Sequence, residues 1–577
     1  MHDFVIRGGH IVDGSGAPAF NGDVAVDDGM VTQLGGKAGT ARREIDADGL
    51  LVTPGFVDVH THYDGQATWD AHLAPSGWHG VTTIVMGNCG VGFAPARPDR
   101  HDWLIQLMEG VEDIPGSALA EGMQWGWETF PEYMDALERF PRAVDIGTQV
   151  PHGAVRAYVM GDRGAANEDA TDEDIAAMSA IVEDGLRAGA LGFTSSRTML
   201  HRAKDGVPVP GTFAGHEELI GIGRACGRAG HGVFEIATDF GIGGMHGRFN
   251  EDIAWMRDLS KETGLPVSFI LAQAAHEPEQ WRDILRWMDE AVAEGANLRA
   301  QVATRPAGML LNFDNEMHPF KGHPTYLKVA HLPFAERVAA LSTPEMRAQL
   351  GAEQTSLTGK FDTFFVNHFD NMYPLGDPPN YEPTPESSVA GIASRQGRTP
   401  QEILLETMLA NDGRDFVYYP IINYADTNFD SIREMLLHPQ ALLSLSDGGA
   451  HCGVICDASA PSYMLTHWVR DRTRGERLPL EFAVKLQTRD TATAYGLNDR
   501  GLLAPGMRAD INVIDLDNLE LHAPEAVHDL PASGRRLVQR VDGYKATLQA
   551  GEVTYEDGIA TGALPGKLIR GPQADPR

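Results

Sequence analysis

The feature that most constrains the fold is a strand-then-helix rhythm that repeats along residues 171–305. Apolar runs such as GALGFTSS (189–196) and GVFEIAT (232–238) alternate with amphipathic segments. In the segment 171–189, Thr171 is a candidate N-cap, acidic residues fill the first turn and Gly189 is the expected end. Its apolar residues recur at helical spacing: Ile175, Met178, Ile181, Val182 and Leu186. This alternation predicts a parallel sheet covered by helices.

Four further apolar segments complete the pattern of strands. They are GFVDVH (55–60), VTTIVMG (81–87), VDIGTQV (144–150) and ALLSLS (441–446). With the strands of the repeating section, the total reaches the number that closes a (β/α)8 barrel. The predicted fold class is therefore α/β, with a TIM-like barrel as the main domain.

The two ends of the chain have a different character, because both are rich in short β-type segments broken by Gly and Asp. They predict a small β-sandwich domain formed by both termini. The expected organisation is 1–54 in the β domain, 55–480 in the barrel, and 481–577 as return segment and second part of the β domain. Two stretches depart from the rhythm and are predicted insertions, at about 97–141 and 306–440. In the second insertion 324–341 is expected to be helical.

Charge and composition exclude several kinds of protein. The 577 residues include 47 Lys and Arg against 80 Asp and Glu, a net charge of −33, without any basic cluster. Nucleic acids and anionic membranes are bound by clustered cations, so neither is an expected partner. The N-terminus lacks the pattern of a signal peptide, no apolar run has the length of a membrane span, and four cysteines are too few for a disulfide framework. We expect a cytoplasmic protein.

The segment GFVDVHTH (55–62) carries the first candidate site. Side chains alternate along a strand, so His60 and His62 point the same way from the end of the first barrel strand. Two imidazoles at the catalytic end of a barrel are a ready pair of metal ligands.

A carboxylate completes this pattern at the other end of the barrel sequence. Asp447 directly follows the eighth strand and precedes Gly448 and Gly449. Facing the two histidines across the barrel mouth, it would act as general base in metal-assisted hydrolysis. The alternative is that Asp447 only caps the next helix.

These motifs together resemble the amidohydrolase superfamily, and its N-acyl-D-amino-acid deacylase (D-aminoacylase) branch in particular. The segments that carry the resemblance are PGFVDVHTHYDGQATWD (54–70), GVTTIVMGNCGVGFAP (80–95), VPHGAVR (150–156), GALGFTSS (189–196), LSDGGAH (445–451) and GLLAPGMRADINVIDLD (501–517).

The resemblance implies a zinc site and a reaction. The cysteine of GNCG, here Cys89, would be a zinc ligand together with His60, His62 and Asp447. Asp447 would act as base toward water and then as acid toward the leaving amine. The implied activity is hydrolysis of an N-acyl-D-amino acid or a similar N-acyl compound. Alternatives are a cyclic amide or lactone hydrolase of the same superfamily, or an inactive metal-binding barrel.

The sequence departs from the family at two ligand positions. Members usually carry a histidine at the end of strand 5 and another at the end of strand 6, whereas GVFEIATDF and PVSFILAQ contain none. Either Glu235 replaces a histidine as an oxygen ligand, or the site is built around one metal with the remaining ligands. We expect one zinc ion, and a second metal is left open.

Further polar groups follow the barrel strands and are candidates for binding a small-molecule N-acyl substrate. An acyl-amino acid carries a carboxylate, which Arg binds well, and Arg197 after strand 4 is the first choice. A surface salt bridge is the alternative for Arg197. The other candidates are His152, His201, Lys204, Arg305, Tyr373, Tyr381 and His451. The sequence leaves a homo-oligomer open.

Overall fold

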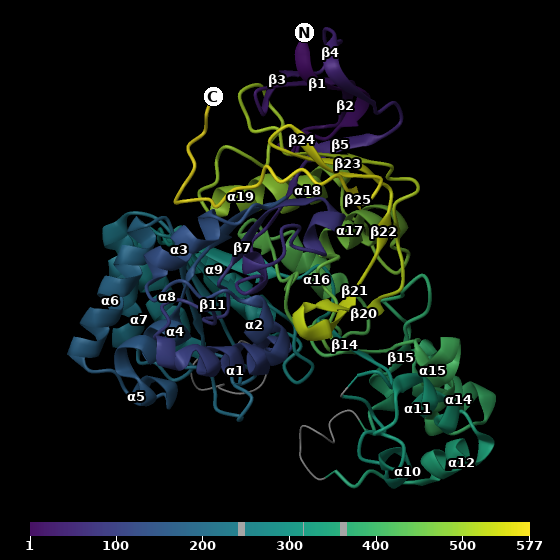
Figure 1. Cartoon of the computed structure of the whole chain (residues 1–577). Coiled ribbons are helices and arrows are strands. Elements are labelled where there is room, and N and C mark those ends of the chain that lie inside the picture. The colour runs from purple at the N-terminus through teal and green to yellow at the C-terminus, as the bar shows by residue number, and fades with distance from the viewer. Residues whose placement is uncertain (240–248, 316, 358–365) are drawn as a thin grey trace.

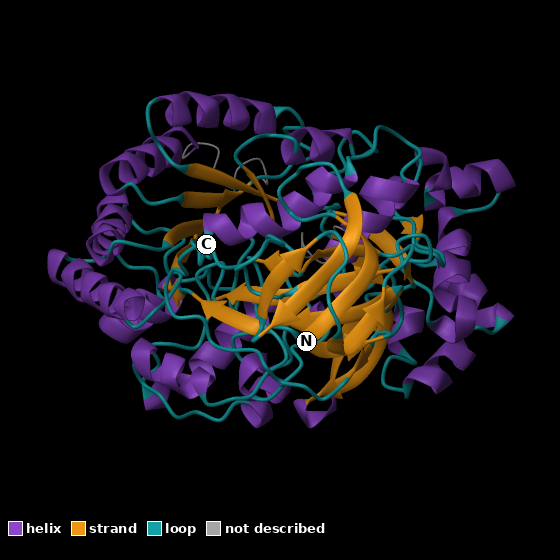
Figure 2. Cartoon of the chain, turned by 90° about the horizontal axis from the view of Figure 1, so that it is seen from above, coloured by secondary structure: helices purple, strands orange, loops and turns teal. Residues whose placement is uncertain are grey.

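The structure is a computed structural model, and it describes residues 1–239, 249–315, 317–357 and 366–577. Parallel strands form its centre (Figures 1 and 2). A three-stranded sheet contains β6 (Phe56–Asp58), β7 (Val81–Met86) and β8 (Asp145–Thr148). A six-stranded sheet contains β9 (Val150–Pro151), β10 (Gly192–Ser196), β11 (Val233–Ala237), β12 (Val267–Ile270), β13 (Leu298–Val302) and β17 (Ala441–Leu443).

The two sheets are connected at both ends. β8 and β9 are separated by a single residue, and the described strand pairings within these two sheets are all parallel. Beyond the last strand, Thr61 and Gly448 form an isolated parallel bridge, and the N–H of His62 donates to the carbonyl of Gly448 at 2.8 Å. The segments that follow β6 and β17 are thereby held together, and the α/β class is confirmed.

Helices alternate with these strands and lie outside them (Figure 2). The repeating section contains α4 (His152–Met160), α6 (Asp172–Arg187), α7 (His216–Ala229), α8 (Phe249–Thr263) and α9 (Gln280–Ala293). The predicted N-cap of α6 is confirmed, because Thr171 and Asp174 form a reciprocal capping box. The apolar face of α6 is buried at Met178, Val182 and Leu186.

A nine-stranded sheet combines strands from both ends of the chain. From the N-terminal part it contains β1 (His2–Ile11), β2 (Phe20–Asp27), β3 (Met30–Leu34), β4 (Ala41–Asp46) and β5 (Leu51–Pro54). From the C-terminal part it contains β18 (Ile511–Ile514), β23 (Tyr544–Gln549), β24 (Glu552–Glu556) and β25 (Ile559–Ala560). The join is the antiparallel pair β5–β18, with Val52 opposite Val513. The predicted domain boundaries are not tested by this arrangement and stay predictions.

The segment expected as the first insertion is helical, with α1 (His101–Glu112), α2 (Gly116–Gly122) and α3 (Phe130–Glu138). The second contains the antiparallel strands β14 (Gly308–Leu311), β15 (Tyr373–Pro374) and β16 (Val417–Pro420). Its helices include α12 (Pro344–Ala352), α14 (Val389–Gln396) and α15 (Pro400–Gly413), and they form the lobe at the lower right of Figure 1 around a separate hydrophobic core. The expected helix over 324–341 is wrong in detail: Pro333 separates α10 (Pro324–Leu327) from α11 (Phe334–Leu341).

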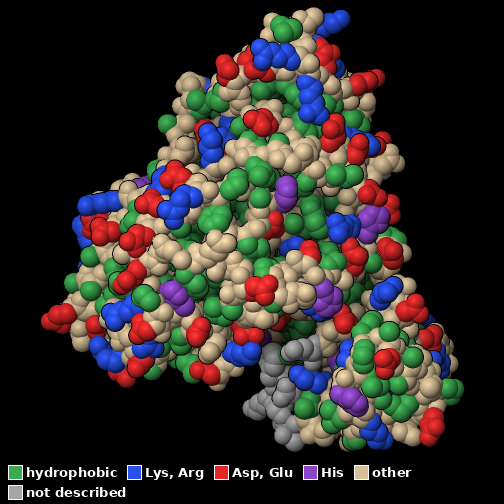
Figure 3. Space-filling model, in the orientation of Figure 1, with side chains coloured by type: hydrophobic (Ala, Val, Ile, Leu, Met, Phe, Trp, Pro, Cys, Tyr) green, Lys and Arg blue, Asp and Glu red, His purple; other side chains and the backbone are tan. Residues whose placement is uncertain are grey.

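Acidic and basic side chains are interspersed over the face shown in Figure 3, so the negative charge is diffuse on this side. In the described part of the chain, no helix combines the length and apolar character needed to cross a membrane.

Candidate metal centre

His60 and His62 follow β6 and are both fully buried. Nε2 of His60 lies 3.2 Å from Sγ of Cys89. One ligand atom from each of His60, His62 and Cys89 lies within 4.8 Å of the others. The structure therefore brings together the two predicted histidine ligands and the predicted thiol ligand.

The orientation of His60 is set by a neighbouring strand. Its Nδ1 lies 2.7 Å from Oε1 of Gln301, on β13, and an amide oxygen can only accept a hydrogen bond. Gln301 is fixed in turn, because its Nε2 donates to Ser268 at 3.0 Å and its Oε1 accepts from Ser444 at 2.8 Å. The proton of neutral His60 is thus on Nδ1, and the lone pair of Nε2 faces Cys89.

Cys89 comes directly after β7 in an unusual backbone conformation. Its φ angle is +58°, in the left-handed region that non-glycine residues rarely adopt. At the next residue, Gly90, a Cβ atom would lie 2.8 Å from the backbone nitrogen of Ser196, so the close approach requires glycine. Burial raises the pKa of the Cys89 thiol well above its usual value, and the charges of Glu235 and Glu112 raise it further. The tight turn aims this thiol at His60.

Asp447 reaches the same group from the segment after β17. Its Oδ1 lies 3.5 Å from Nε2 of His60 and 3.7 Å from Nε2 of His62. Its backbone is also left-handed, with φ +47°. Desolvation raises its pKa to about 8, and the charge of Asp457 contributes. Since 19 % of its side chain stays exposed, Asp447 connects the buried histidines to solvent.

Glu112, the last residue of α1, is a member of the site that the sequence analysis missed. It is almost fully buried, its Oε1 lies 3.4 Å from Nδ1 of His62, and its backbone carbonyl accepts a hydrogen bond from the N–H of His451. Burial raises its pKa well above the usual value, and so does the charge of Asp447. One signal was present in the sequence: Glu112 continues the apolar stripe of Leu104 and Met108, and an acid on such a stripe is unusual.

Glu235, on β11, lies behind the thiol. Its Oε2 accepts the backbone N–H of Cys89 at 3.2 Å, whereas its buried Oε1 has no hydrogen-bond partner in the described part. Burial raises the pKa of Glu235 to about 8. The predicted alternatives, ligand or structural acid, both remain compatible with this position.

The chemistry of these groups fits a divalent cation. The raised pKa values of Cys89, Glu112, Glu235 and Asp447 show that the protein itself supplies little positive charge to them. His62 Nδ1, Glu112 Oε1 and Glu235 Oε1 are buried without a hydrogen bond. A bound metal ion stabilises the anionic forms of such acids and so offsets the free-energy cost of burying them. Two imidazoles and a thiol, with carboxylates beside them, form a donor set of the type that binds zinc.

Two further predicted residues lie near this group. His451 Nε2 is 3.8 Å from Oε2 of Glu112 and 3.9 Å from Oδ2 of Asp447. His201 accepts or donates a hydrogen bond with Ser196 at 3.1 Å, and the charges of His451 and His60 act on its pKa. Burial is the largest influence and lowers the pKa of His451 to about 4 and that of His201 to about 3, so both are neutral at pH 7.

Other candidates for substrate binding have partners of their own. Arg197 forms an ion pair with Asp252 at 3.0 Å and donates to the carbonyl of Ala214 at 2.7 Å. The structure thus gives Arg197 a buried salt bridge where the sequence suggested a free cation or a surface pair. Lys204 pairs on the surface with Glu109 at 2.7 Å.

His152 lies in a separate buried network, between Ser195 at 2.9 Å and Glu218 at 2.8 Å. Arg305 donates to Asp457 and stacks over the ring of Tyr381 at 3.9 Å. Tyr373 packs against Tyr424. None of these contacts includes a member of the metal-ligand group. Their predicted roles toward substrate stay predictions.

Comparison with known proteins identifies the family of this chain. The model of the amidohydrolase family matches residues 43–555. The chain therefore belongs to the amidohydrolase family. It is 26 % identical over 580 residues to D-aminoacylase of Alcaligenes xylosoxydans xylosoxydans, covering 98 % of this chain and 97 % of that protein. An uncharacterized protein of Mycobacterium tuberculosis is 27 % identical, with 96 % of this chain and 92 % of that one covered.

Solved structures show the same fold. A crystal structure of D-aminoacylase superposes with a TM-score of 0.64 at 23 % identity, covering 99 % of this chain and 100 % of that chain. The N-acyl-D-glutamate deacylase of Bordetella bronchiseptica, solved with zinc and a phosphonate inhibitor, superposes with a TM-score of 0.63 at 23 % identity and the same coverage. The chain is thus a D-aminoacylase-like member of its family.

Proposed function

We propose that this chain is a zinc-dependent hydrolase that removes the acyl group from an N-acyl-D-amino acid or a similar N-acyl compound. The observation that carries the proposal is the group His60, His62 and Cys89 with Asp447 facing it. The full-length similarity to D-aminoacylase supports the choice of a linear amide. As part of this proposal, the parallel strands close into a (β/α)8 barrel and the terminal strands form a β-sandwich, which puts the four residues at the mouth of the barrel.

In this proposal, zinc is held by His60, His62 and Cys89, with Asp447 or Glu235 as oxygen ligand. When bound, zinc would polarise the scissile carbonyl and acidify the attacking water. Gln301 holds His60 in the tautomer that presents Nε2, and Glu112 orients His62 through Nδ1.

Asp447 carries the proton in the proposed reaction. It accepts a proton from the attacking water, whose oxygen bonds to the acyl carbon, and gives that proton to the amide nitrogen as the C–N bond breaks. The products are a carboxylic acid and a free amine. Desolvation raises the pKa of Asp447 to about 8 in the metal-free protein. The charge of a bound zinc ion would lower this pKa, so Asp447 would be anionic and able to accept the proton near neutral pH.

The test combines metal analysis with a panel of N-acyl-D-amino acids, N-acyl-L-amino acids and cyclic amides. We expect about one zinc per chain and hydrolysis of the N-acyl-D compounds. Asp447→Asn should lower kcat by about 10²–10⁴-fold. If the protein contains no metal and hydrolyses none of these compounds, the proposal is wrong and the alternative of an inactive barrel holds. Hydrolysis of cyclic amides alone would assign the chain to that other class of amidohydrolase.

A further inference from the structure

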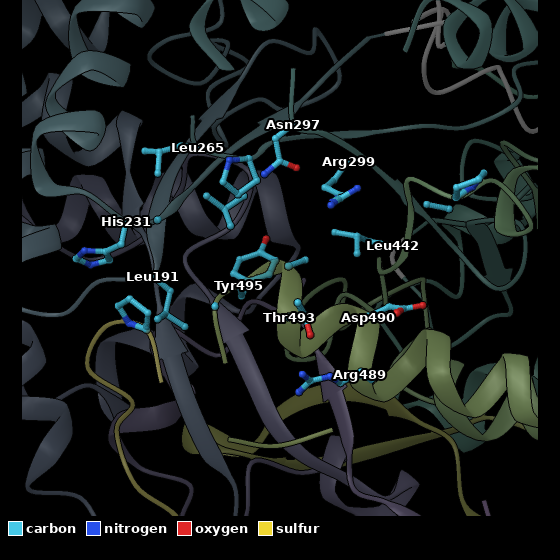
Figure 4. Close-up of a pocket in the computed structure, with 18 of the residues that line it drawn as sticks. Leu191, His231, Leu265, Asn297, Arg299, Leu442, Arg489, Asp490, Thr493 and Tyr495 are labelled. Carbon is cyan, nitrogen blue, oxygen red and sulfur yellow. The ribbon is translucent and has the colours of Figure 1, made fainter. Parts of the chain in front are cut away.

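A cavity of about 720 Å³ lies at the opposite end of the parallel strands from the metal centre (Figure 4). Its wall includes residues at the N-terminal ends of these strands: Val233 begins β11, Pro266 precedes β12 and Ala441 begins β17. The segment of η8 (Leu486–Asp490) and α19 (Thr491–Ala494) covers this end, and Tyr495 lies in the middle of the labelled lining residues. His60, Cys89 and Asp447 all follow the C-terminal ends of strands.

Arg299, on β13, contributes a cation to the cavity wall. It is two residues before Gln301, so both side chains point to the same side of the strand. Within the described residues, no hydrogen bond or ion pair of its guanidinium occurs, and its electrostatic partner is Asp490. Burial lowers the pKa of Arg299, which means that its charge is partly desolvated. A desolvated guanidinium of this kind favours an anionic partner.

Two more cations line the same cavity. Among the described residues, Arg489 donates hydrogen bonds only to backbone carbonyls, those of Asn498 at 3.3 Å and Arg500 at 3.4 Å, and its charge also acts on Asp575. Lys485 is paired with Asp490 at 2.7 Å, and Asp490 is the single acid among the lining residues. The nearby Asp575 is bound to Arg577 at 2.7 Å. The three cations and one acid of the lining give a formal charge of 3 − 1 = +2, in a chain whose net charge is −33.

The remainder of the wall is largely apolar. Leu191, Leu265 and Leu442 line it together with Val233 and the ring of Tyr495. Such a wall suits an aliphatic group, while the two guanidinium groups suit a carboxylate or a phosphate.

We propose that this cavity binds a small organic anion, with an acidic head group held by Arg299 and Arg489 and an aliphatic body against the leucines. The site is separate from the metal centre and does not depend on the proposed reaction. A carboxylate and a phosphate ester share the required chemistry, so the experiment includes both head groups.

Binding is measured by isothermal titration calorimetry on the full-length, metal-loaded protein, with octanoate, octyl phosphate and octanol as probes. We expect at least one of the two anions to bind and octanol to bind at least about tenfold more weakly. Arg299→Met keeps the aliphatic stem and removes the charge, so it should weaken binding of the anion by about tenfold or more. The matched control is Arg224→Met, which removes an exposed arginine paired with Glu262.

A carboxylate can also bind zinc, so the metal-depleted protein is the second control and should bind the anion as tightly as the metal-loaded protein. Unchanged affinity in Arg299→Met, or loss of binding in the metal-depleted protein, would overturn the proposal, as would absence of binding by both anions. If Arg299→Met fails to fold by circular dichroism, Arg489→Met replaces it with the same expected tenfold loss.

Discussion

The two ends of the parallel strands carry opposite kinds of buried charge. Beyond the C-terminal ends, Cys89, Glu112 and Asp447 have raised pKa values because burial disfavours their anionic forms. At the N-terminal ends, Arg299 has a lowered pKa because burial disfavours its cationic form. The difference favours a cation at the candidate metal centre at one end of the strands and an anion in the proposed cavity at the other.

β13 contributes one residue to the candidate metal centre and one to the proposed anion cavity, two positions apart. Gln301 orients His60 at the metal end, and Arg299 lines the cavity at the other end. A period of two along a strand keeps both side chains on one side of the sheet, while the rise per residue separates them along the strand. We therefore expect changes at one end to leave the other end intact, and the following predictions test this separation.

The largest effect is expected for Cys89→Ala, which removes the proposed thiolate ligand from the candidate metal centre. Metal affinity should fall by on the order of a thousandfold, and activity should fall with it. Zinc per chain after dialysis, measured by inductively coupled plasma mass spectrometry, checks this. Cys226→Ala is the matched control, because Cys226 is buried within α7 away from the ligand group. Equal zinc content in both variants would refute the assignment of Cys89.

A smaller effect is expected for Glu112→Gln, because the proposed function gives Glu112 a role in orienting His62 and no role as a zinc ligand. Loss of such an orienting acid typically costs about 10–100-fold in metal affinity or activity. Competition with a chelator measures the affinity. The neighbouring acid Glu109, whose side chain is 25 % exposed and paired with Lys204, provides the control Glu109→Gln. Identical affinities for the two variants would show that Glu112 is only structural.

The pH dependence of metal binding follows from Asp447. Desolvation raises the pKa of Asp447 to about 8 in the metal-free protein. Below pH 8 the carboxyl group must therefore lose its proton before it can bind the metal. Affinity should therefore rise with pH, by about tenfold per pH unit from this group between pH 6 and 8. In Asp447→Asn the slope of log affinity against pH should drop by about one. An unchanged slope would mean that Asp447 does not titrate on metal binding.

The smallest effect is a change in stability at the N-terminal ends of the parallel strands, where the proposed anion cavity lies. Arg299 is a partly desolvated charge without an ion pair, so Arg299→Met should raise the free energy of unfolding by about 0.5–1 kcal/mol. Chemical denaturation of the metal-loaded protein measures this change, and zinc content should stay constant. A loss of zinc in this variant would contradict the independence of the two ends.

Much of the metal centre follows from local sequence patterns. The alternation in a strand predicts that His60 and His62 point the same way, and the position after the eighth predicted strand indicates Asp447. The resemblance to the family adds Cys89. All four residues lie within four positions of the ends of β6, β7 and β17, so their placement depends on elements that the sequence indicates clearly. The capping box at Thr171 is predictable for the same reason, because all its atoms lie within four consecutive residues.

Contacts between distant segments could not be predicted. Arg197 follows a strand as expected, but its charge is paired with Asp252, which α8 brings to it. Glu112 lies in a predicted insertion whose helices pack in a way that no periodicity specifies. Its position on the apolar stripe of α1 is a signal for burial, but its partner His62 is fifty residues away in the sequence. No local sequence motif marks Arg299 as a residue that lines a cavity.

The pair β5–β18 has a consequence for how the protein is made. β5 ends at Pro54 and its partner begins at Ile511, so ribosomes must add 457 residues before the pair can form. At about 5–20 residues per second, this delay is roughly 20–90 s. During translation the backbone groups of β5 that face β18 lack their partner strand, which is a hazard for aggregation. Newly made chains should thus depend on chaperones until the last strands emerge.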